Sequence, residues 1–149
     1  MSLRNWLDNR WLVEHKPSPE EVADLLSVVD RDLQDAVVDR ISADWRLGIA
    51  YNAALQLATL ALAAEGYRPE RQRSHEMAVQ SLRYTVGLSQ GAIDKLDTVR
   101  RKRHLSNYER AGTASQREAE EVYDMAIELR RTVIEWLGGN LPNLLGDLT

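Results

Sequence analysis

Apolar residues recur every three or four positions along most of this chain, which is the spacing of one face of an α-helix. The clearest run follows Ser18-Pro19-Glu20-Glu21 and contains Val22, Leu25, Leu26, Val29, Leu33, Ala36, Val37 and Ile41. Ser18 and Glu21 have the spacing of a capping box, with proline in the first turn. We therefore expect a helix from Pro19 to about Ile41, with Glu21 reaching back to its N-terminus.

The next predicted helix runs from about Ala43 to Glu65, with Ser42 as its N-cap. Its segment from Ile49 to Ala64 is the most apolar in the chain, but polar side chains interrupt it. It is too short and too polar for a membrane span, and its alanines indicate a helix surrounded by other helices. Gly66 suits the left-handed position that ends a helix.

Three further helices complete the pattern. The first is expected from Ser74 to Leu88, and the second from a break at Ser89-Gln90-Gly91 to about Tyr108. Ser115 and Glu118 form a second capping box, which opens a last helix ending at Gly138-Gly139. No stretch has the period-two alternation of a strand. The fold class is therefore all-α, an antiparallel bundle of four or five helices.

The ends of the chain have different patterns from the bundle. Residues 1–17 are expected to form a leading helical segment that lays Trp6 and Trp11 on the bundle, which itself spans residues 18–139. Residues 140–149 contain Pro142 and Gly146 and predict an irregular tail. With 149 residues the chain has the size of one domain.

Composition removes several classes of chemistry. The chain has no cysteine, and its three histidines, at positions 15, 75 and 104, do not have metal-ligand spacing. We therefore expect no metal and no other cofactor. The first residues lack the apolar core of a secretory signal, so we expect a cytoplasmic protein that does not associate with membranes.

Charge is distributed unevenly. The net charge is −4, but the segment from Arg68 to Arg110 carries ten basic and five acidic residues, a net of +5. The rest of the chain therefore has a net charge of −9. This asymmetry favours a local anion-binding site over a general nucleic-acid coat, although a solvated, charged helix surface has the same composition.

One face of the helix that ends near Tyr108 changes character along its length. At 100° per residue, an arc of about 100° holds first apolar and then cationic or polar residues. They are Ile93, Leu96, Arg100, Arg103, His104 and Asn107. Cations on such a face need an anionic partner, which is an acidic side chain of the same chain near Asp30 or Asp35, a second subunit or a phosphate. Arg101 is expected to pair with Asp97, four residues earlier.

The segment from Asp97 to Tyr108 resembles the signature helix of the HEPN superfamily, a group of small helical bundles that usually dimerise. Many of them are metal-independent ribonucleases, and some are toxins of toxin–antitoxin pairs. Their motif is an arginine, a polar residue, a few further residues and a histidine. Arg103 matches the arginine and His104 the polar residue, whereas Tyr108 takes the place of the histidine.

The resemblance implies a dimer with an RNA- or nucleotide-binding site. Arg103 would hold phosphate with help from Arg100 and Asn107, and Arg103, His104 and Tyr108 would take the catalytic positions. A tyrosine has an ordinary pKa of about 10 and is a poor base at neutral pH, so we expect a variant or inactive ribonuclease. Tyr108 can still donate a hydrogen bond to phosphate or stack on a base.

The alternative is a helical interaction module without enzymatic activity. Such a bundle would form a dimer or bind a partner protein encoded nearby, either an antitoxin-type protein or a nucleotidyltransferase. In that case Arg103 would belong to a network of structural ion pairs.

Overall fold

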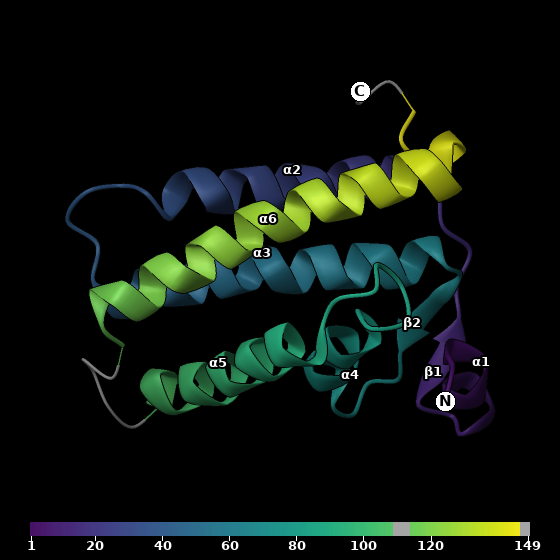
Figure 1. Cartoon of the computed structure of the whole chain (residues 1–149), viewed down its shortest axis with the longest axis horizontal. Coiled ribbons are helices and arrows are strands. Elements are labelled where there is room, and N and C mark those ends of the chain that lie inside the picture. The colour runs from purple at the N-terminus through teal and green to yellow at the C-terminus, as the bar shows by residue number, and fades with distance from the viewer. Residues whose placement is uncertain (109–113, 147–149) are drawn as a thin grey trace.

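The protein is a helical bundle with a small two-stranded sheet at one end (Figure 1). The structure is a computed structural model that describes residues 1–108 and 114–146, together with all their side chains except those of residues 103–108. Its elements are α1 (Leu3–Asp8), β1 (Leu12–Glu14), α2 (Pro19–Asp35), α3 (Ala43–Ala64), β2 (Tyr67–Pro69), α4 (Ser74–Ser81), α5 (Gln90–Tyr108), α6 (Gln116–Asn140) and a 3-10 turn (Pro142–Leu144). The predicted helical class is confirmed.

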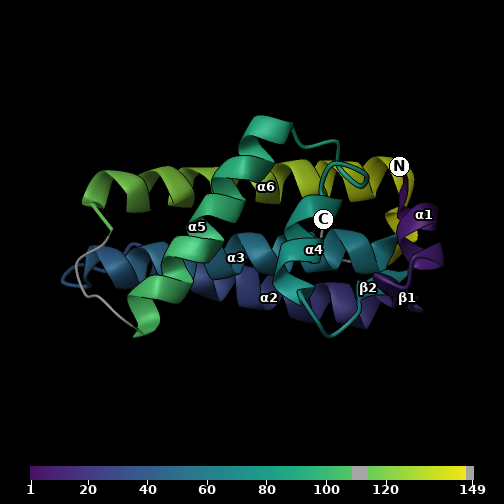
Figure 2. The same cartoon turned by 90° about the horizontal axis from the view of Figure 1, so that it is seen from below.

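Helix α3 lies at the centre of the bundle. Helices α2 and α6 cover one side of it, and α4 and α5 cover the other (Figures 1 and 2). Successive long helices alternate in direction, but α3 and α6 run the same way and pack directly against each other. Alanines at positions 50, 53, 54, 58 and 61 of α3 are buried and allow helices to approach from several sides.

The length and apolar composition of α3 would also suffice to cross a membrane, contrary to our expectation from its sequence. The helix spans 22 residues, and its most apolar window has a mean hydropathy of 1.5. In this fold, however, 72% of that window is buried against other helices. The prediction of a helix surrounded by other helices is confirmed, and its composition is that of a core helix.

The starts of three long helices are as predicted. The hydroxyl groups of Ser18, Ser42 and Ser115 each accept a hydrogen bond from the backbone amide three residues later. The capping box at Ser115 is complete, because Glu118 also accepts from the Ser115 amide. After α3, Gly66 has a φ of +96°, in the left-handed region that glycine adopts without steric cost.

The capping box predicted at Ser18 is only half formed. Ser18 accepts from the amide of Glu21, but the Glu21 carboxylate does not reach back to the helix start. Both of its oxygens lie 2.8 Å from Nε2 of His15 instead. This contact ties the chain before α2 to the first turn of the helix.

Two helices end earlier than their apolar pattern predicts. Helix α2 stops at Asp35, where Arg46 of α3 donates hydrogen bonds to the carbonyl oxygens of Ala36 and Val38 at 2.7 and 3.1 Å. Helix α4 stops at Ser81, before the left-handed Gly87. In the first case a tertiary contact satisfies the carbonyl groups at the helix end, which the sequence pattern alone does not reveal.

The leading segment is only partly helical, so the expectation of a strand-free fold is wrong. After α1, residues Leu12–Glu14 pair antiparallel with Tyr67–Pro69, with Val13 opposite Arg68. Leu3, Trp6, Leu12, Leu62 and Met77 form a separate small core there. Pairs of three-residue strands are too short to produce a visible alternation.

Candidate nucleic-acid interface

The face predicted to bind an anion belongs to α5, which crosses α3 obliquely (Figure 2). Its first half is anchored by Ile93, Leu96 and Val99, all of which are buried in the main core. Its second half continues as a helix to Tyr108, so the backbone carries the basic run to the end of the bundle where α3 begins. The apolar part of this face therefore lies in the core, and its basic part lies at the end of the bundle.

Four of the five predicted site residues lie on these last turns. The Cα atoms of Arg103, His104 and Asn107 fall on the same face as that of Arg100 because the helix is continuous there. The side chains of these three residues and of Tyr108 lie outside the described part of the structure. Their roles in binding or catalysis therefore stay predictions.

Arg100 is described, and it forms an ion pair within its own helix. Its Nε lies 2.9 Å from Oδ1 of Asp97, three residues earlier. Arg101 reaches the other oxygen of the same carboxylate, with 3.5 Å between Nε and Oδ2. The predicted pair between Arg101 and Asp97 is confirmed, but Asp97 also binds Arg100. One carboxylate thus faces two guanidinium groups.

Two lysines on α5 link it to α6. Lys95 Nζ lies 2.9 Å from Oε2 of Glu121, and Lys102 Nζ contacts Oε2 of Glu118. The hydrogen bond from Lys102 lowers the pKa of Glu118 below its usual range, and the backbone amide of Ser115 acts in the same direction. The hydrogen bond from Lys95 likewise lowers the pKa of Glu121. These pairs connect the first and second halves of α5 to the start of α6.

Replacing Lys102 with methionine should raise the pKa of Glu118 toward the ordinary value of a glutamate. Folding lowers this pKa, so the pair stabilises the fold above the unfolded-state pKa, and that contribution is lost as the pH falls through the folded-state pKa. A carbon-13 NMR titration of the Glu118 carboxyl group measures the shift. Lys95→Met is the matched control, since it should move the pKa of Glu121 and leave Glu118 unchanged. If the pKa of Glu118 is unchanged in Lys102→Met, the pair does not form in solution.

The basic end of α5 keeps excess positive charge despite these ion pairs. Residues 97–108 contain four Lys or Arg residues and one carboxylate, and Glu118 of α6 pairs with Lys102, so four cations face two carboxylates and the net charge is +2. Surface ion pairs contribute only about 0–1 kcal/mol each, so a phosphate can compete for their cations. An anionic ligand therefore has an available partner at this end of the bundle.

An exposed tryptophan lies at the same end and was not singled out from the sequence. Trp45 belongs to the first turn of α3 and is 70% exposed, which is unusual for so large an apolar side chain. Val37 and Val38, which follow α2, are also exposed. From the sequence, the N-cap serine at position 42 and the apolar Leu47 could have indicated which side of the first turn of α3 faces solvent. Aromatic rings beside positive charge are the usual platform for unpaired bases.

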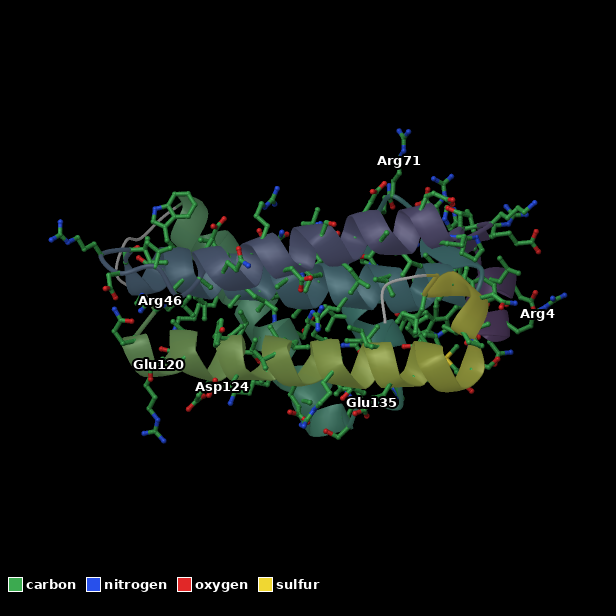
Figure 3. All side chains as sticks on the ribbon, turned by 90° about the horizontal axis from the view of Figure 1, so that it is seen from above. Arg4, Arg46, Arg71, Glu120, Asp124 and Glu135 are labelled. Atoms are coloured by element: carbon green, nitrogen blue, oxygen red, sulfur yellow. The ribbon has the colours of Figure 1, made fainter. Side chains whose placement is uncertain are left out.

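A groove opens between the end of α2 and the first half of α6. It has a volume of about 310 Å³ and is lined by Ala36, Val37, Arg46, Glu120, Tyr123 and Asp124. Figure 3 shows Arg46 on one side of it and Glu120 and Asp124 along α6 on the other. No feature of the sequence pattern predicts this groove, because its residues come from α3, α6 and the connection that follows α2.

Asn52, a polar residue in the middle of α3, has a partner on a neighbouring helix. Nδ2 of Asn52 donates a 2.7 Å hydrogen bond to Oδ2 of Asp32 on α2, a carboxylate that is only 6% exposed. The side chain of Asn52 is therefore engaged within the subunit. Asp30, one of the two acidic residues suggested as partners of the basic face, pairs instead with Arg130 of α6, whose Nε lies 2.7 Å from its Oδ1.

Comparisons with protein-family models, with curated proteins and with solved structures find no match to this chain. The likeness to HEPN proteins therefore rests on the sequence motifs described above.

Proposed function

We propose that this protein is an HEPN-like helical domain that binds RNA or a nucleotide at the C-terminal half of α5. The observation that carries the proposal is the sharing of Asp97 by Arg100 and Arg101, which leaves the helix end with excess positive charge. The exposed Trp45 at the same end of the bundle provides a ring on which a base can stack. The excess positive charge would bind phosphate. The exposed ring of Trp45 would add base stacking when the ligand is single-stranded.

The proposed roles follow the HEPN motif. Arg103 holds a phosphate, Arg100 adds charge, His104 and Asn107 orient the ligand, and Tyr108 stacks or donates a hydrogen bond. In a homodimer two such helix ends would double the local charge. With tyrosine in the histidine place, we propose binding with weak or absent cleavage of RNA, since no strong base accompanies the arginine.

Fluorescence polarisation with a labelled single-stranded RNA tests the proposal at low salt. Arg103→Ala should weaken binding about tenfold. It should also reduce the slope of log affinity against log salt concentration by about one, which corresponds to one released counterion. Arg71→Ala is the matched control: this exposed arginine also lies in the basic segment, but outside α5. Equal affinities for the wild type and Arg103→Ala, or an equal loss in Arg71→Ala, would exclude a specific phosphate site. The same RNA, followed on a gel, measures any cleavage.

A second function, a protein-interaction module, is favoured by a different observation. Every described cation on α5 has a carboxylate partner within the chain, while Val37, Val38 and Trp45 expose apolar surface. The partner would be a second copy or a protein encoded nearby. Co-purification with the products of neighbouring genes tests it, because Trp45→Ser should abolish the association without unfolding the bundle. Retained association would contradict a role for this surface.

A further inference from the structure

The groove between α2 and α6 has a chemical character different from that of α5. Its apolar part consists of Ala36, the exposed Val37 and the half-buried Tyr123, and its edge on α6 carries Glu120 and Asp124. These two carboxylates are one helical turn apart and both are exposed. Like charges at this spacing repel each other.

Neither of these two carboxylates has an ion-pair partner among the described residues. Glu118, Glu121 and Glu128 on the same helix each contact a Lys or Arg side chain. For Glu120 and Asp124, by contrast, no basic nitrogen of residues 1–102 or 114–146 lies within 4.0 Å. The first half of α6 thus combines neutralised carboxylates facing α5 with two unneutralised ones facing the groove.

The one cation that lines the groove is already engaged. Arg46 donates to the carbonyl oxygens of Ala36 and Val38, and its Nη1 donates to Oε1 of Gln116 at 2.7 Å. These three hydrogen bonds join the ends of α2, α3 and α6, so moving Arg46 toward the carboxylates would break them. With Arg46 included, the lining residues carry a net charge of −1. Further positive charge has to come from a ligand.

We propose that this groove binds a basic, amphipathic segment of a partner protein. Such a segment places an apolar side chain against Val37 and Tyr123, and its Lys or Arg residues contact Glu120 and Asp124. A nucleic acid is disfavoured because the two carboxylates repel its phosphates. A second copy is also disfavoured, because the chain is acidic overall, with a net charge of −4. The groove would bind this segment whether or not α5 binds RNA.

The probe for this proposal is a labelled amphipathic peptide of about 18 residues, five helical turns, made of leucine and lysine. A peptide of the same pattern with glutamate in place of lysine is its counterpart. The double variant Glu120→Lys/Asp124→Lys should weaken binding of the lysine peptide about tenfold or more by fluorescence polarisation. The glutamate peptide should not bind the wild type measurably.

A matched control separates the groove from the overall charge. Asp24→Lys/Glu135→Lys changes the net charge by the same amount at exposed helical positions outside the groove lining. It should keep binding within about twofold of the wild type, since distant surface charges are screened at physiological salt. An equal loss in both double variants would show non-specific attraction and overturn the proposal.

Val37→Asp tests the apolar half of the groove. Val37 is 55% exposed, so the variant should remain folded by circular dichroism and yet bind the lysine peptide about tenfold more weakly. Unchanged binding would overturn the proposed mode.

Sedimentation velocity of the protein without peptide tests whether a second copy of the chain occupies the groove. A dimer that dissociates on Glu120→Lys/Asp124→Lys would assign the groove to a second copy and contradict a separate partner.

Discussion

Replacing Leu57 with alanine is expected to lower the free energy of unfolding by about 2–5 kcal/mol. Leu57 lies near the middle of α3, is fully buried and belongs to the main core. Because α3 packs against both α2 and α6, a cavity at this position removes contacts at the centre of the bundle. Only part of such a cavity is filled by relaxation of its surroundings, which adds to the lost transfer free energy.

Urea denaturation followed by circular dichroism measures this effect. The neighbouring variant Gln56→Ala is the control, because Gln56 is only partly buried and alanine is a good helix former. It should change the free energy of unfolding by less than about 0.5 kcal/mol. Similar small losses in both variants would mean that α3 is not the central helix, which would contradict the fold itself.

The second large effect is expected at the buried pair between Asp32 and Asn52. Asn52→Leu removes the 2.7 Å hydrogen bond to Asp32 and leaves Arg31 as the only described partner of this carboxylate. A buried acceptor that loses a hydrogen bond costs about 1–3 kcal/mol, and a charged group is at the upper end of this range. We expect Asn52→Leu to destabilise the protein by about that amount in the same urea experiment.

A double-mutant cycle shows whether the loss comes from the unpaired carboxylate. In Asp32→Leu/Asn52→Leu both polar groups are gone, and apolar side chains of similar size replace them. This double variant should be more stable than Asn52→Leu alone, since no buried charge is left without its partner. Additive losses in the cycle would contradict a direct interaction between the two side chains.

The helix starts could be predicted because they depend on local chemistry. A serine that caps the third residue of a helix and a glycine with positive φ are encoded within a few neighbouring positions. Ser42, Ser115 and Gly66 all behave in this way. The early end of α2 could not be predicted by the same means, because Arg46, from the following helix, satisfies the carbonyl groups at this end.

The electrostatics of the candidate site were only partly accessible from the sequence. The pair between Arg101 and Asp97 follows from helical spacing, and the spacing of Arg100 could have indicated that it shares this carboxylate. The contacts of Lys95 and Lys102 with α6 depend on how α5 crosses the bundle. Packing between helices distant in the sequence sets that crossing, and no local pattern encodes it.

The same packing separates two surfaces of opposite charge at one end of the bundle. Ion pairs between α5 and α6 use the carboxylates of Glu118 and Glu121, whereas Glu120 and Asp124 point toward the groove on the α2 side (Figure 3). Helical periodicity separates Glu118 from Glu120, because residues two positions apart lie about 200° apart around a helix. The basic helix end and the acidic groove can therefore serve different ligands.

The most direct test of the proposed function is an NMR titration of the nitrogen-15-labelled protein with a short single-stranded RNA. We expect saturable shifts of backbone amides in the last turns of α5 and in the first turn of α3, where Trp45 lies. The shifts should shrink as salt is added, since phosphate contacts release counterions. The absence of saturable shifts at the end of α5 at low salt, or shifts confined to another part of the bundle, would contradict the account.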